Sequence, residues 1–230
     1  VDANLAHSMV QAAISHLPSS VPALFLPVQR IGYSREHTAF AGTLSLKADT
    51  VIRLWTDIAE SVAVSGVSKL VLFNTHGGNV GLMDVVARDL RTRLGMLVYC
   101  VSWFNLPLKG ADGEELMARF SADEQRFGVH GGEVETAMML ALKPRLVRKT
   151  KVQNFVSSSQ RRSQDFPILG NGRSAKLAWA AQDLHPDGAA GNAAAAQPED
   201  GLALVDAAGR SLAALLEEID RLPPDTLRGM

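Results

Sequence analysis

Apolar positions recur at helical spacing along much of the chain, and short, wholly apolar runs lie between these stretches. The helical spacing predicts four amphipathic helices, at residues 3–17, 47–65, 80–94 and 202–222. Apolar runs of strand length predict strands at 23–27, 70–73 and 96–101. The 131–142 stretch ends before Pro144 and is apolar on all sides, which predicts a buried helix.

Helices and strands therefore alternate, which indicates βαβ units and a mainly parallel sheet covered by helices, an α/β fold. A short helix is expected at 114–120, and 151–184 is polar and irregular, as in a long surface excursion. We find no internal repeat and no convincing linker, so residues 1–230 are expected to form one domain. Ligands of such sheets bind at the carboxyl ends of the strands, and residues 74–79 follow one of these ends.

Charge and cysteine content exclude several classes of protein. Lys plus Arg number 23 and Asp plus Glu number 24, so there is no basic excess for nucleic-acid binding. No apolar run approaches the ~20 residues that cross a bilayer. Cys100 is the only cysteine, so no intrachain disulfide can form and a cytoplasmic location is expected. Its apolar surroundings favour a buried structural thiol over a nucleophile.

Residues 74–79 read Asn-Thr-His-Gly-Gly-Asn directly after a predicted strand. A neutral imidazole at His76 suits a zinc-class ion. Gly77 and Gly78 allow a sharp turn and a close approach to a ligand, and they open a helix whose first N–H groups are available to an anion. The alternatives are a plain strand-to-helix turn and, more weakly, a phosphate-binding loop.

Residues 128–136 read Gly-Val-His-Gly-Gly-Glu-Val-Glu-Thr and lead into the predicted buried helix. A carboxylate buried in its first turn is costly unless it is paired or binds a metal. Glu133 and Glu135 point to different sides of a helix, and Glu135 is the one that we expect to face a site. The alternative is that Glu135 pairs with an arginine or caps the helix.

Two further segments carry weaker signals. Asp2 stands where a helix N-cap is expected, which needs no functional explanation. The predicted loop 32–42 holds Ser34, Glu36 and His37. Two interpretations are open: these side chains line a pocket, or they belong to an ordinary surface loop. Trp103 follows a strand end and is a candidate pocket residue.

In this order, the segments resemble the creatininase family of metal-dependent amidohydrolases, with the mycofactocin-precursor peptidase among its members. The matches are Val1-Asp2, the Glu-His-x-x-Phe-x-Gly-Thr-Leu loop at 36–44, the Asn-x-His-Gly-Gly-Asn turn at 74–79 and the His-Gly-Gly-x-x-Glu-Thr helix start at 130–136. A looser match is the Gly/Asn turn at 187–192. The resemblance covers nearly the whole chain and implies a creatininase-like three-layer sandwich and a homo-oligomer, a hexamer in this family.

The resemblance also implies residue roles. Asp2 matches an aspartate that bridges two metal ions, His76 a metal-ligand histidine, and His130 a proton-shuttling histidine. Creatininase itself has a tyrosine and a metal-binding glutamate after the ligand histidine, where this chain has Gly77 and Gly78. We expect Glu135 to fill that vacancy as metal ligand and catalytic residue, and the difference argues against creatinine as substrate.

The family's Glu-x-His-Gly segment, which should stand shortly before Asp2, is not among the 230 residues, and we expect it upstream of them. The implied activity is hydrolysis of a C–N amide bond in a small non-peptide or short-peptide substrate at two divalent ions, zinc, manganese or iron. Candidate substrate-binding residues are Ser34, Glu36, His37, Gly77, Gly78, Asn79 and Trp103. The alternatives are a metal-poor binding or structural relative, a serine or cysteine hydrolase, and a nucleotide-binding module.

Overall fold

The computed structural model describes residues 1–228, and these form two compact units, each built from several segments. The sheet unit comprises residues 2–34, 44–107 and 208–228. The loop unit comprises residue 1 and residues 35–43 and 108–207. Helix α8 (Pro198–Arg221) contributes its first part to the loop unit and its second part to the sheet unit.

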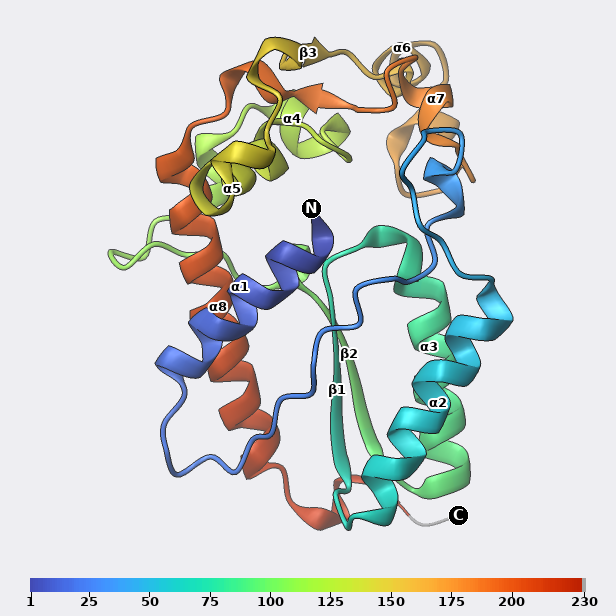
Figure 1. The fold of residues 1–230 in the computed structure, drawn as a ribbon, viewed down its shortest axis with the longest axis vertical. Coiled ribbons are helices and arrows are strands. Elements are labelled where there is room, and N and C mark those ends of the chain that lie inside the picture. Colours follow the sequence, from blue (N-terminus) through green and yellow to red (C-terminus); the bar gives the residue numbers. More distant parts are fainter. Residues whose placement is uncertain (229–230) are drawn as a thin grey trace. The chain divides into compact units, whose positions relative to one another are not determined.

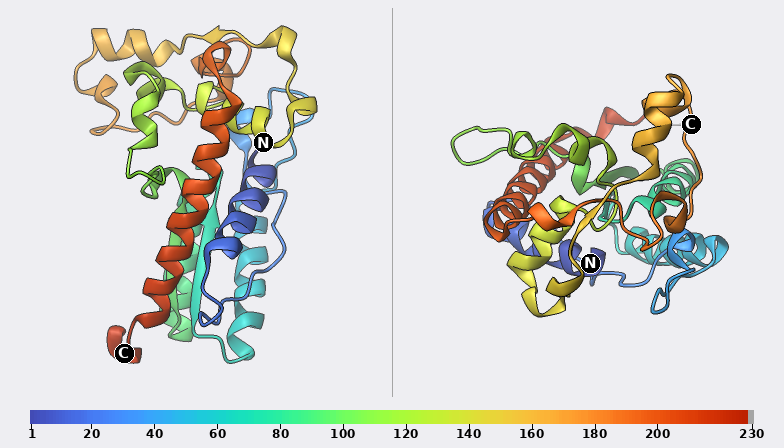
Figure 2. Two further views of the ribbon diagram at one scale, coloured as in Figure 1. Left: turned by 90° about the vertical axis from the view of Figure 1, so that its left-hand side faces the viewer. Right: turned by 90° about the horizontal axis from the view of Figure 1, so that it is seen from above.

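The sheet unit has an α/β/α arrangement of three layers (Figure 1). Strands β1 (Lys69–Asn74) and β2 (Leu97–Ser102) pair in parallel, from Lys69 opposite Leu97 to Asn74 opposite Ser102. Helices α2 (Ala48–Val64) and α3 (Val80–Leu94) cover one face, while α1 (Asp2–His16) and the second part of α8 lie on the other, as the left view of Figure 2 also shows.

Apolar side chains on facing elements hold these layers together. Ala59, Val86, Leu90 and Met96 form a buried cluster between the sheet and its α2–α3 layer. On the opposite face α1 and α8 approach so closely that a side chain at Gly209 would collide with Ala12. Lys69 at the start of β1 donates hydrogen bonds to the carbonyl oxygens of Ile219, Asp220 and Leu222, at 2.8, 2.8 and 2.9 Å. These carbonyl groups lie at the C-terminal end of α8, where the helix dipole favours a positive charge.

The loop unit is largely helical. It contains α4 (Ala122–Phe127), α5 (Glu133–Leu142), α6 (Ser158–Asp165), α7 (Ala181–Leu184) and the first part of α8. Strands β3 (Asn154–Phe155) and β4 (Gly191–Asn192) form a short antiparallel pair. Helix α5 is buried along Val134, Ala137, Met138 and Met139, and its backbone touches α8 at Gly201.

The α/β class and the parallel sheet are confirmed, and the five longest predicted helices and two of the three strands lie within a few residues of their expected bounds. The predicted strand at 23–27 is wrong: this segment is extended but belongs to no strand among the described residues. The predicted helix at 114–120 is a 3-10 helix at Leu116–Arg119, and the 151–184 stretch includes α6 and α7. Cys100 is exposed, which corrects its expected burial. Within residues 1–228, no helix combines the length and apolar character needed to cross a membrane.

Candidate active site

The turn after β1 is held by the side chain of Asn74, which is buried. Its Oδ1 accepts the N–H of His76 at 3.1 Å, and its Nδ2 donates to the His76 carbonyl at 2.9 Å and to Ser102 Oγ at 3.1 Å. Asn79 also donates to Asn74 Oδ1, at 3.3 Å, and accepts the N–H of Tyr33 at 3.1 Å. This network fixes the backbone on both sides of His76 against β2.

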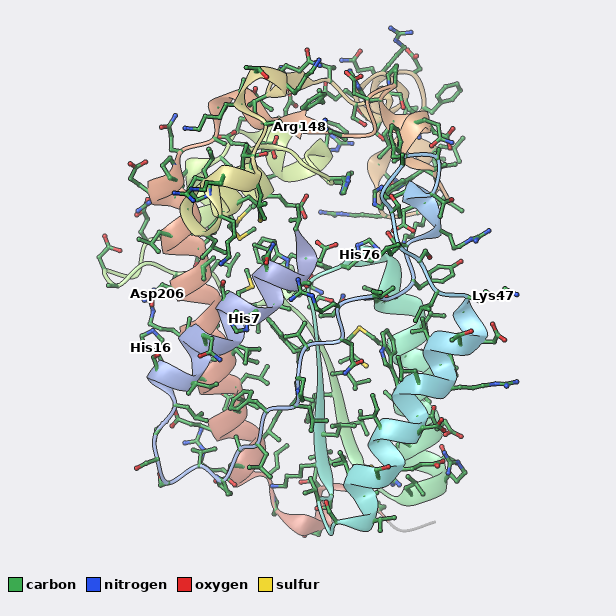
Figure 3. All side chains as sticks on the ribbon, viewed as in Figure 1. His7, His16, Lys47, His76, Arg148 and Asp206 are labelled. Atoms are coloured by element: carbon green, nitrogen blue, oxygen red, sulfur yellow. The ribbon has the colours of Figure 1, made fainter. Side chains whose placement is uncertain are left out.

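His76 contacts Asp2 from the first turn of α1, and Figure 3 shows His76 at the carboxyl end of β1. Its Nδ1 lies 3.3 Å from Asp2 Oδ2, with the imidazole 14% and the carboxylate 37% exposed. Thr75 Oγ1 donates to the Asp2 carbonyl at 3.0 Å, which ties the start of α1 to the strand end. Asp2 is the first residue of α1 rather than a residue preceding it.

The first of the two glycines after His76, Gly77, has open space beside it. Gly77 and Gly78 enter a 3-10 helix, Gly77–Asn79, that leads into α3, and neither has a positive φ. A side chain at Gly77 would meet no described atom within 4 Å. The sharp turn therefore comes from the Asn74 network, and the glycine leaves room beside His76.

Ser34 lies in the same unit, where its N–H donates to Ser45 Oγ at 2.9 Å.

In the loop unit, His37 is buried and lies against three other side chains. Its Nε2 is 3.7 Å from Glu36 Oε1, and its ring stacks on His130 with ring centroids 3.9 Å apart. Trp179 meets the His37 ring edge-on at 6.1 Å. Thr43 Oγ1 donates to the His37 carbonyl at 2.9 Å, which holds this loop closed. Stacking limits both imidazoles to a narrow range of orientations.

Glu135 turns back toward the residues that precede α5. Its Oε2 accepts the N–H of Gly131 at 2.5 Å and lies 3.9 Å from His130 Nδ1. Gly131 has a φ of +61°, which favours glycine and allows the chain to fold back onto the carboxylate. His130 exchanges two backbone hydrogen bonds with Ala190, at 3.3 and 2.7 Å.

The buried carboxylate of Glu124 anchors this loop. Its Oε1 accepts the N–H groups of Glu133 and Val134 at 2.7 and 3.4 Å, and its Oε2 accepts that of Asn192 at 2.7 Å. A Cβ at Gly128, Gly132 or Gly191 would lie closer than 3.0 Å to Glu124. These glycines therefore serve the close approach to Glu124.

Burial and the neighbouring negative charges of Glu124 and Asp200 raise the pKa of Glu133.

In the sheet unit, Trp103 is buried and meets Phe104 edge-on at 6.1 Å. The substrate-binding roles of Trp103, Ser34 and Asn79 stay predictions. Sequence reasoning missed Glu124 and Trp179, and it did not single out Asn74. The clustered glycines are the signal that pointed to a close neighbour such as Glu124.

The residues expected to bind metal offer imidazole nitrogens and carboxylate oxygens. Asp2 and His76 pair in the sheet unit, and His130 and Glu135, like His37 and Glu36, pair in the loop unit. Mixed nitrogen and oxygen ligands of this kind suit Zn²⁺ and Mn²⁺. The chemistry of the donors therefore fits a divalent ion.

Known proteins share both sequence and fold with the chain. A family model described as creatinine amidohydrolase matches residues 1–216. The mycofactocin precursor peptide peptidase of Mycobacterium ulcerans is 31% identical over 125 residues, which are 54% of this chain and 41% of that protein. The Mycobacterium tuberculosis peptidase is 30% identical over 125 residues, which are again 54% of this chain and 41% of that protein. The chain thus spans less than half the length of these curated relatives.

Solved structures share the fold at low identity. A Bacteroides fragilis protein described as a creatinine amidohydrolase has a TM-score of 0.72 at 23% identity, covering 96% of this chain and 80% of its own. A manganese form of creatininase has a TM-score of 0.65 at 24% identity, with coverages of 90% and 80%. A Zn-Zn form of a creatininase mutant has a TM-score of 0.66 at 23% identity, with coverages of 91% and 81%.

The match over residues 1–216 covers nearly all of the sequence, including Asp2, the 74–79 turn and the 130–136 helix start. The chain therefore belongs to the creatininase family.

Proposed function

We propose that this chain forms part of a metal-dependent amidohydrolase that hydrolyses a C–N bond in a small amide or a short peptide. The observation that carries the proposal is the pairing of His76 with Asp2 at the carboxyl end of β1, in a chain of this family. The carboxyl ends of parallel strands are where α/β proteins bind ligands. Asp2, His76 and Glu135 are the proposed metal ligands. We propose that two ions bind and that the metal is zinc, manganese or iron.

A bound divalent ion supplies an activated water and polarises the carbonyl of the scissile amide. Asp2 and Asn74 hold the His76 ring and backbone, so its orientation is set before any ligand arrives. His130 is the proposed proton shuttle, since its Nδ1 lies near a Glu135 carboxylate that can stabilise the imidazolium. Backbone N–H groups at Gly77 and Gly78 are proposed to stabilise the developing oxyanion.

The proposed substrate is a short peptide or small amide other than creatinine. A curated relative is a peptide peptidase, and Gly77 and Gly78 have no side chain to provide a carboxylate of the kind that creatininase uses. Glu36 and His37 are proposed to contact the substrate from the loop unit. A homo-oligomer and a cytoplasmic location complete the proposal.

The test replaces His76 with alanine and measures bound metal by elemental analysis together with kcat on short peptides, formamides and creatinine. We expect metal content to fall below half and kcat to fall at least about 10²-fold, as for the loss of one group that acts in the transition state. His7→Ala is the matched control, because His7 is exposed on α1 of the same unit. Unchanged metal and full activity in His76→Ala would refute the assignment.

A metal-poor binding protein is the second candidate, and Gly77 and Gly78 favour it because neither residue after His76 supplies a carboxylate. Elemental analysis separates the two: near-zero zinc, manganese and iron in the purified protein supports this candidate. About one or two equivalents support the hydrolase.

A further inference from the structure

A dense group of positive charges follows α5 in the loop unit. Residues 143–151 read Lys-Pro-Arg-Leu-Val-Arg-Lys-Thr-Lys and lie between the end of α5 and β3 (Figure 1). We call this stretch the basic segment. It holds five of the 23 Lys and Arg residues and none of the 24 Asp and Glu residues. The rest of the chain is therefore net acidic, and positive charge is concentrated in one place.

The cationic side chains of the basic segment have no anionic partner among residues 1–228. Within this described part of the chain, none of them forms an ion pair or a side-chain hydrogen bond. Arg119 of the same unit, in contrast, pairs with both Glu114 and Asp200. Like charges at this density repel one another, and an anionic ligand relieves that repulsion. All five side chains are exposed, and Figure 3 labels one of them, Arg148: Lys143, Arg145, Arg148, Lys149 and Lys151.

Hydrogen bonds order the backbone of the basic segment. Pro144–Leu146 and Lys149–Lys151 are 3-10 helices. The last residue of each helix donates its N–H to the carbonyl three residues earlier, at 2.9 and 2.8 Å. The charges therefore project from a defined backbone, which reduces the ordering cost that a ligand must overcome when it binds.

The basic segment lies in the same unit as His130 and Glu135. Glu135 is in the first turn of α5, and Lys143 directly follows the last residue of that helix. At about 1.5 Å per residue, α5 places Lys143 about 12 Å beyond Glu135 along the helix axis. An extended peptide covers that distance in about four residues. A peptide held near Glu135 therefore reaches the basic segment with residues about four or more positions from its scissile amide.

The composition of the basic segment favours a peptide over other anions. It contains no aromatic residue, whereas single-stranded nucleic acids bind through stacked aromatic side chains. Duplexes require many phosphate contacts, and the rest of this chain is net acidic. Segments that lie on membranes need an apolar face, and Leu146, 65% exposed, is the one large exposed hydrophobic residue within 143–151.

We propose that the basic segment is a docking site for an acidic stretch of the peptide substrate. This identification of the partner rests on the proposed function, whereas the binding itself needs no catalysis. Carboxylates of the peptide pair with the exposed Lys and Arg side chains and add affinity without contact with the reacting groups. An exposed pair contributes at most about fivefold in affinity, so selectivity comes from several pairs together.

The test compares two fluorescein-labelled peptides by fluorescence anisotropy in about 50 mM salt. One peptide has four glutamates followed by Gly-Ala-Gly-Ala-Gly, and in the other glutamine replaces each glutamate. We expect the acidic peptide to bind at least tenfold more tightly, and about 500 mM salt to remove the difference because it screens exposed charges. Equal affinities at low salt would overturn the proposal.

The variant Arg145→Gln/Lys149→Gln should bind the acidic peptide about tenfold more weakly. Lys47→Gln/Arg53→Gln is the matched control, because both residues are exposed in the sheet unit and the same charge is removed. It should bind within twofold of the unsubstituted chain. An equal loss in the two variants would show that overall charge, and not the basic segment, attracts the peptide.

Two further measurements separate docking from catalysis. With peptides that the protein hydrolyses, Arg145→Gln/Lys149→Gln should raise KM about tenfold when glutamates stand at least four residues from the scissile amide, and less than twofold when glutamines replace them. An equal change in KM for both peptides contradicts the docking site. His76→Ala tests the proposed function independently: it should lose metal and still bind the acidic peptide. If it loses that binding, the peptide binds at the metal site and the proposal fails.

Competition identifies the occupant of the basic segment. A single-stranded oligonucleotide and vesicles of anionic phospholipid are titrated against the bound acidic peptide. Displacement by either at a lower charge concentration than the unlabelled peptide, lost in Arg145→Gln/Lys149→Gln, would assign the segment to that ligand and overturn the proposal. A change of oligomeric state in the same variant, measured by light scattering, would assign the segment to contact between copies and overturn it as well.

Discussion

The Glu124 carboxylate offers the sharpest test of how the loop unit is held together. It is 4% exposed and accepts three backbone N–H groups, two on Oε1 and one on Oε2. Glu124→Gln keeps the shape but replaces one acceptor oxygen with an NH₂ group, which then faces an N–H donor. One charge-assisted hydrogen bond is lost, and a buried donor is left without an acceptor.

The lost charge-assisted hydrogen bond costs about 1.5–3 kcal/mol, and the buried donor left without an acceptor costs about 1–3 kcal/mol, in mutational series. Part of the cost is offset, because the Glu124 charge, which after burial is the next cause of the raised Glu133 pKa, disappears. We therefore expect Glu124→Gln to lower the free energy of unfolding by about 3 kcal/mol. Urea titrations at pH 7, followed by circular dichroism, measure the change. Asp123→Asn is the control: Asp123 is exposed in the same helix turn, and its loss should cost about 0.5 kcal/mol or less.

The anchored loop carries His130 and Glu135, so activity should fall too. A displacement of about 1 Å costs about 10²-fold in rate when a reacting group is positioned by its surroundings. A Glu124→Gln variant as stable as Asp123→Asn would refute the anchoring role.

Three further predictions concern single contacts. Glu133 has a raised folded-state pKa, so its contribution to stability is complete below the unfolded carboxyl value of about 4.3 and is lost as pH rises through the folded value. Glu133→Gln should flatten this dependence in urea titrations between pH 4 and 8, and a parallel shift of the whole curve would contradict the prediction. Gly191→Ala should lower the free energy of unfolding by about 2 kcal/mol more than Gly113→Ala. Both glycines have a positive φ, but only Gly191 has crowded neighbours. Equal losses would show that backbone strain from the positive φ accounts for both and that crowding adds nothing. Lys69→Met should lower the melting temperature by several degrees through the loss of about 1.5–3 kcal/mol of charge-assisted bonds, whereas Lys47→Met should leave it within a degree.

Much of the sheet unit could be predicted from periodicity. Helices α2, α3 and α8 have apolar stripes, and strands β1 and β2 have apolar runs, and the tendency to remove such surface from water favours the element. The segment at 23–27 has the same apolar character but no pairing edge among the described residues. Composition reports the tendency to form a strand, whereas pairing depends on a partner that composition does not reveal.

The candidate site was predictable only in part. His76 and Glu135 stand out because glycines and an adjoining strand or helix mark their surroundings. Glu124 stands in an ordinary amphipathic turn, and its function in the loop depends on three amides that lie up to 68 residues away. Trp179 meets His37 from a stretch without any periodic pattern. Contacts between such distant segments leave no mark in local spacing.

The order in which segments of the sheet unit occur has a consequence for biosynthesis. The ribosome completes both strands by residue 102 but produces the helical segment beyond residue 207 much later. Until that segment emerges, the apolar face that it will cover remains open to solvent and to other nascent chains, and Lys69 lacks the carbonyl groups that it will bind. We therefore expect chains stalled shortly after residue 200 to depend strongly on chaperones, because one side of their sheet is covered by α1 alone.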